Sequence, residues 1–139
     1  MKKIYFAITI LASIVILISC GSSRTIAIEE GWDLLGETKV NFVRDRDELA
    51  VTGTNRYTAI RFKVEGKDII LKDVKVVFQS GDKLEPLIEE EIKAGQYSKV
   101  VELAQEGKNI SHIEFKYRST GSIFKGRATV MVFGRRYPY

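Results

Sequence analysis

The sequence predicts an all-β fold: an antiparallel β-sandwich of about eight strands, jelly-roll-like or Greek-key, that follows an N-terminal signal helix. From Trp32 onward, apolar and polar residues alternate, and this period of two is typical of antiparallel strands that bury one face. Turn-forming residues, mostly glycine with polar neighbours, interrupt the alternation at short intervals, as they do between the strands of a sandwich. After the signal, no segment shows an apolar stripe of helical spacing.

The expected strands follow one another along the chain between these turns. They lie at roughly 34–43, 47–52, 57–65, 68–79, 86–92, 97–103, 109–118 and 124–133. The third shows the pattern clearly, because Ile60, Phe62 and Val64 alternate with basic residues. The fifth expected strand is rich in glutamate, a residue that is depleted in strands. Its side chains still follow the period of two, and Pro86 at its start is compatible with an edge strand. We expect one core to contain Ile60, Phe62, Val76, Phe115 and Val130.

The N-terminal 19 residues have the layout of a secretory signal. Lys2 and Lys3 precede an apolar run of about fifteen residues, which is shorter than the roughly 20 needed to span a bilayer. Its end, Leu17-Ile18-Ser19-Cys20-Gly21, resembles a bacterial lipobox, in which the cysteine receives diacylglycerol and becomes the first mature residue. We therefore predict a signal peptide at 1–19, lipidation of Cys20 and a tether at 20–31. An uncleaved anchor and an ordinary signal peptide cut elsewhere are the alternatives.

The mature chain has the size of one domain, expected at 32–134 with a C-terminal tail at 135–139. Loss of Lys2 and Lys3 lowers the formal net charge from +4 to +2, which weakens any case for a nucleic-acid partner. The expected partners are the membrane, through Cys20, and an envelope protein or glycan. Because Gly21 is not the aspartate that favours inner-membrane retention, the outer membrane facing the periplasm is the favoured location in a two-membrane organism.

Residues for catalysis or metal binding do not form a recognisable motif. His112 is the only imidazole, and we expect it to be a solvated strand residue. Its neighbour Ser111 should not reach it as a nucleophile, because successive strand residues point to opposite faces. With Cys20 lipidated, no His/Cys zinc site can form. The sequence thus predicts a protein that is not an enzyme, with no catalytic residue, metal or cofactor, although a carboxylate pair of the glycosidase type could be hidden among its acids.

Two charged groups are candidates for a role on the surface. Asp45, Arg46 and Asp47 are predicted to form a structural charge cluster between strands, with Ca²⁺ binding as the alternative. The basic residues Arg61, Lys63, Lys116 and Arg118, together with Lys75, would form a surface for an anionic glycan or lipid headgroup if their strands share one sheet. An ordinary solvated face is the alternative for this basic surface.

Aromatic residues are expected in two settings. Trp32 precedes the first predicted strand and is expected to plug one end of the sandwich. Aromatics at turns, such as Tyr97, are of the kind that sandwich modules use to stack on sugars.

Six segments follow one another at a recognisable spacing: Trp32-x-Leu34-Leu35-Gly36, Asp45-Arg46-Asp47, Ile60-Arg61-Phe62-Lys63-Val64, Val74-x-Val76-x-Phe78, Ala94-Gly95-Gln96-Tyr97-Ser98 and Ile113-Glu114-Phe115-Lys116-Tyr117-Arg118-Ser119. In this order they resemble a family of small secreted bacterial proteins of unknown function that are predicted to be β-sandwiches. The resemblance covers about residues 32–134 and implies the fold and the envelope address, without catalytic residues. We expect a non-catalytic binding or structural module of the envelope. A glycan- or anionic-ligand-binding module is the alternative, and a small envelope hydrolase is the third.

Overall fold

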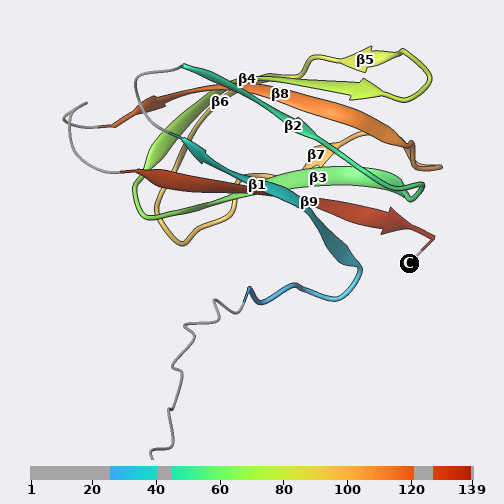
Figure 1. Cartoon of the computed structure of the whole chain (residues 1–139), viewed down its shortest axis with the longest axis horizontal. Coiled ribbons are helices and arrows are strands. Elements are labelled where there is room, and N and C mark those ends of the chain that lie inside the picture. The colour runs from blue at the N-terminus through green and yellow to red at the C-terminus, as the bar shows by residue number, and fades with distance from the viewer. Residues whose placement is uncertain (1–25, 41–44, 121–126, 139) are drawn as a thin grey trace, which may run out of the picture.

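Two antiparallel sheets packed face to face make up the computed structural model, which describes residues 26–40, 45–120 and 127–138 (Figure 1). The predicted all-β sandwich is confirmed. Cys20 and the predicted signal lie outside the described residues. Within the described ranges, no helix has the length and apolar character needed to cross a membrane.

The four-stranded sheet, the lower layer in Figure 1, has the order β1-β9-β3-β7. Its strands are β1 (Trp32–Val40), β9 (Ala128–Tyr137), β3 (Arg56–Glu65) and β7 (Val101–Glu102). The N-terminal and C-terminal strands of the domain are therefore direct neighbours, and β9 joins β1 to β3.

The five-stranded sheet, the upper layer, has the order β2-β8-β4-β5, and β6 also pairs with β4. Its strands are β2 (Arg46–Ala50), β8 (Ile110–Ser119), β4 (Ile69–Phe78), β5 (Lys83–Leu84) and β6 (Leu87–Ile92). Pro86 separates β5 from β6, and the two short strands pair with successive parts of β4. The predicted edge position of the glutamate-rich segment agrees with this arrangement.

The strands differ from the expected ones most clearly in three places. The short strand β5 was not expected. The expected strand at 97–103 is reduced to Val101–Glu102, because the Ser98 hydroxyl accepts a hydrogen bond from the Phe62 N–H at 2.8 Å in place of a backbone carbonyl. The last strand continues to Tyr137, beyond residue 134, where we expected the domain to end.

The core lies between the sheets and contains the five residues predicted for it. Ile60, Phe62, Val76, Phe115 and Val130 are all buried. The Phe62 and Phe115 rings, one from each sheet, meet edge to face with their centroids 5.6 Å apart, a geometry that aromatic pairs prefer.

A second apolar cluster covers the outer face of the four-stranded sheet, where polar residues were expected. Trp32, Ala59, Met131 and Phe133 are buried there, and Ile26 from the segment before β1 packs against them. The prediction that Trp32 plugs one end of the sandwich is therefore wrong. The reason is that β9 carries apolar residues on both faces, and Trp32 covers the outer one.

Candidate functional site

Charged side chains from three neighbouring strands cover the outer face of the five-stranded sheet. On β8, Glu114 and Lys116 alternate with buried residues and so point away from the core. Glu48 of β2 lies directly opposite Glu114 on one side, and Lys75 of β4 lies opposite it on the other. Arg46 lies opposite Lys116. The face therefore carries two cross-strand rows of charged residues. Glu48, Glu114 and Lys75 form one row, and Arg46 and Lys116 form the next.

Ion pairs connect the lysines of these rows to carboxylates on the same face. Lys75 Nζ lies 3.3 Å from Glu114 Oε2 and 3.9 Å from Glu85 Oε1. Lys116 Nζ lies 3.7 Å from Asp73 Oδ2. These pairs are partly exposed, so each contributes little to stability, and their acidic members offset the positive charge of the face.

The structure does not bring the predicted basic surface together. Arg61 and Lys63 lie on β3, in the four-stranded sheet, whereas Lys116 and Arg118 lie on β8, in the five-stranded sheet. Their alternation with core residues points the two pairs away from opposite sides of the sandwich. A shared basic surface would require β3 and β8 to lie in one sheet, and they lie in different sheets. Both strands have the same alternating pattern, and that pattern does not reveal which sheet a strand joins.

Arg61 has a structural environment of its own. Its guanidinium lies between the Trp32 and Tyr97 rings, 4.1 Å from each centroid, and 2.8 Å from the Glu29 carboxylate. The side chain is only 12% exposed. Arg61 therefore helps to hold the Trp32 and Tyr97 rings in place rather than standing free for an anionic ligand.

The predicted charge cluster at 45–47 does join two strands, but the contacts are hydrogen bonds. The Tyr117 hydroxyl donates to Asp47 Oδ2 at 2.6 Å, and the Tyr117 N–H donates to the Asp45 carbonyl at 2.9 Å. Arg46 is exposed and points to the outer face. The aspartates thus fix β2 to β8 through a tyrosine.

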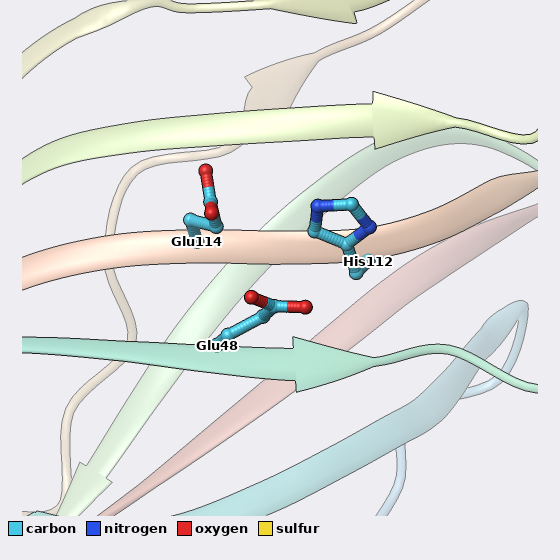
Figure 2. A group of neighbouring side chains, drawn as sticks. All are labelled: Glu48, His112 and Glu114. Atoms are coloured by element: carbon cyan, nitrogen blue, oxygen red, sulfur yellow. The ribbon is translucent and has the colours of Figure 1, made fainter. Parts of the chain in front are cut away.

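Glu48, His112 and Glu114 form a cluster of possible metal ligands on the outer face. One ligand atom from each lies within 4.8 Å of the other two. Figure 2 shows the Glu48 carboxylate on β2 beside the Glu114 and His112 side chains, which project from the same side of β8. Glu48 is exposed, and the other two are half-buried. The arrangement offers one imidazole nitrogen and two carboxylates to a small cation.

A bulge in β8 places Ser111 beside His112. Val77 pairs with His112 and Phe78 pairs with Ile110, so Ser111 is an extra residue in the ladder. Its hydroxyl lies 3.2 Å from His112 Nδ1. The expectation that the two side chains cannot meet is therefore wrong, because a bulge breaks the strict alternation of a strand.

Two shallow hollows lie on either side of Leu87 at the start of β6. The first, about 330 Å³, opens on the charged face and is lined by Lys75, Glu114 and Lys116 among others. The second, about 360 Å³, lies between β6 and the segment around Val100. Leu87 lines both hollows and is 98% exposed.

Neither the ligand cluster nor the exposed leucine was predicted from the sequence. The spacing of His112 and Glu114, two residues apart on a strand, could have shown that they share a face. The sequence carries no signal that pairs Glu48 with Glu114, since that depends on the register between distant strands.

Comparisons with known proteins give a family and a distant fold likeness. The chain matches the family described as a domain of unknown function, DUF2541, over residues 9–134. A solved structure titled "Structural and functional characterization of Pseudomonas aeruginosa AlgX" is similar over 75% of this chain and 27% of its own, with a TM-score of 0.42 and 11% identity. The chain thus spans about a quarter of the length of that structure. Among curated proteins, no sequence matches.

Proposed function

The chain belongs to the DUF2541 family of domains of unknown function, and from that premise we propose that it is an envelope lipoprotein whose sandwich docks a partner protein without catalysing a reaction. The proposed address is the cell envelope, with the anchor at Cys20, and in a two-membrane organism the outer membrane facing the periplasm. The basic and apolar leader and the lipobox-like Leu17–Gly21 support the lipid anchor, and Gly21, which is not the inner-membrane aspartate, supports the outer membrane.

The exposure and position of the Leu87 side chain support docking. A single exposed leucine is ordinary on a protein surface, but the position of this one is not. It stands between two hollows, and Val100, also exposed, lines the second of them. Burial of a leucine side chain contributes roughly 1.5–3 kcal/mol. A partner that covers this edge would gain that energy and could fill both hollows.

Guanidinium groups lie over the exposed aromatic rings, and this favours a protein partner over a glycan. Tyr97 and Tyr137 are the exposed aromatics among the described residues. Arg61 stacks on the Tyr97 ring at 4.1 Å, and Arg56 lies 5.0 Å from the centroid of the Tyr137 ring. A sugar that stacked on those ring faces would have to displace a guanidinium.

Site-specific photo-crosslinking in membranes tests the docking proposal. A photoreactive residue in place of Leu87 is expected to give a discrete adduct with one envelope protein. The matched control replaces Asn55, which is exposed and lines neither hollow. Leu87→Ser should then reduce co-purification of that partner. Identical adducts from both positions, or none from position 87, would contradict docking at this edge.

A separate experiment tests the address. Cys20→Ser is expected to abolish labelling of the chain by a radioactive fatty acid and to release or stall the precursor. Unchanged labelling of the variant would refute lipidation at Cys20 and would leave the docking proposal intact.

A further inference from the structure

We propose that Glu48, His112 and Glu114 bind a divalent transition-metal ion, with Zn²⁺ as the favoured occupant. This inference is independent of the docking function. It rests on the arrangement of the three side chains, the contact that Ser111 makes with the imidazole, and the charge of the cluster.

The positions of the three side chains are set by two hydrogen-bonded strands rather than by loops. His112 and Glu114 are two residues apart on β8, and Glu48 lies opposite Glu114 on β2. Their ligand atoms lie within 4.8 Å of one another. Zinc binds nitrogen and oxygen at about 2.0–2.2 Å, so its tetrahedral ligands lie roughly 3.5 Å apart. Small side-chain rotations would close the remaining distance without moving either strand.

The bulge at Ser111 prepares the imidazole for a metal. Ser111 Oγ lies 3.2 Å from His112 Nδ1. When Nδ1 carries the proton and donates to this hydroxyl, Nε2 is left with its lone pair free for an ion. Metal-ligating histidines commonly have such a partner on the second ring nitrogen, which fixes the tautomer and the ring orientation. The bulge therefore supplies a contact that a regular strand would not.

The charge of the cluster also favours a cation. Glu48 and Glu114 are directly opposite each other on neighbouring strands, where like charges repel. Lys75 offsets part of this charge through Glu114, but it also lies near Glu85 and can keep that contact when Glu114 turns toward an ion. A divalent ion would neutralise both carboxylates at once.

The ligand set selects the class of metal. One imidazole and two carboxylates suit Zn²⁺ and related ions, whereas Ca²⁺ requires six to eight oxygens. Because Glu48 is exposed, water can complete the coordination of the ion.

Zinc titration of the full-length chain tests the site. The protein carries no histidine tag and has Cys20→Ser, so that no thiol competes for the ion. Because His112 is the only histidine, its imidazole resonances report the site without ambiguity. We expect one equivalent of Zn²⁺ to bind and to shift those resonances. His112→Ala and Glu48→Gln should each weaken binding at least tenfold.

Two further variants distinguish zinc binding at this cluster from non-specific attraction of Zn²⁺ to the charged face. Asp73→Asn removes a carboxylate from the same face outside the cluster and should leave zinc affinity within about twofold of the parent. Lys75→Met frees Glu114 from a competing cation and should strengthen binding several-fold. Equal weakening by Asp73→Asn and Glu48→Gln, binding without a shift of the His112 resonances, or displacement of Zn²⁺ by an equal concentration of Ca²⁺ would overturn the proposal.

Discussion

The Tyr117 hydroxyl donates a 2.6 Å hydrogen bond to the Asp47 carboxylate and so connects the core to an edge strand. Tyr117 is only 2% exposed, and its ring packs in the core beside Phe115. Asp47 lies in β2, at the edge of the five-stranded sheet. The edge strand is therefore held by a side chain from the interior as well as by its backbone ladder with β8.

Loss of this hydrogen bond should destabilise the domain. Tyr117→Phe keeps the ring and removes the donor, and bonds to charged acceptors contribute about 1.5–3 kcal/mol. We expect the free energy of unfolding in urea to fall by that amount. A double-mutant cycle with Asp47→Ala should give a coupling energy of at least about 0.5 kcal/mol. Purely additive effects would show that the two groups do not depend on each other.

The pairing of Phe115 with Phe62 predicts a large loss on truncation. Phe115→Ala removes a buried ring and leaves a cavity between the sheets, which should cost about 3–5 kcal/mol in the free energy of unfolding. The neighbouring surface variant Lys116→Ala serves as the control. A loss below roughly 1 kcal/mol for Phe115→Ala would mean that this side chain does not face the core.

Arg61 and Lys116 were expected to behave alike, and the structure predicts that they do not. Arg61→Ala removes a guanidinium held between two aromatic rings and should lower the free energy of unfolding by about 1–3 kcal/mol. Lys116→Ala breaks an exposed ion pair and should change it by less than about 0.5 kcal/mol. Chemical denaturation of both variants makes the comparison. Equal effects would contradict a structural role for Arg61.

The sandwich could be predicted from the sequence because burial on one face of a strand leaves a local pattern. The alternation in Ile60-Arg61-Phe62-Lys63-Val64 requires no knowledge of the neighbouring strands, and the structure buries its apolar members. The run Val130–Phe133 breaks the alternation, and this was the available signal that β9 is covered on both faces.

The candidate site could not be predicted in the same way because it depends on long-range register. Glu48 meets Glu114 only because β2 pairs with β8 at that offset. The bulge that brings Ser111 to His112 depends on how β8 pairs with β4. The basic residues failed as a surface for the same reason, since the alternation within a strand does not reveal which sheet the strand joins.

Tyr57 links the stability of the fold to alkaline pH. Burial raises its pKa above the ordinary value of 10.0, because the ionised phenolate would lose water, and the nearby Asp33 carboxylate opposes ionisation further. The hydroxyl donates to Asp33 Oδ2 at 3.2 Å. In the unfolded chain, Tyr57 regains its ordinary pKa and releases its proton at lower pH than in the folded state.

Between pH 10 and the higher folded-state pKa, the folded state therefore holds more protons than the unfolded state. The contribution of Tyr57 to stability is fully present below pH 10 and is lost as the pH rises through the folded pKa. The informative quantity is the difference between wild type and Tyr57→Phe, because every other group is common to both proteins. We expect urea unfolding to show a steeper alkaline decline for the wild type from about pH 10 upward. Parallel declines would mean that Tyr57 ionises equally easily in both states.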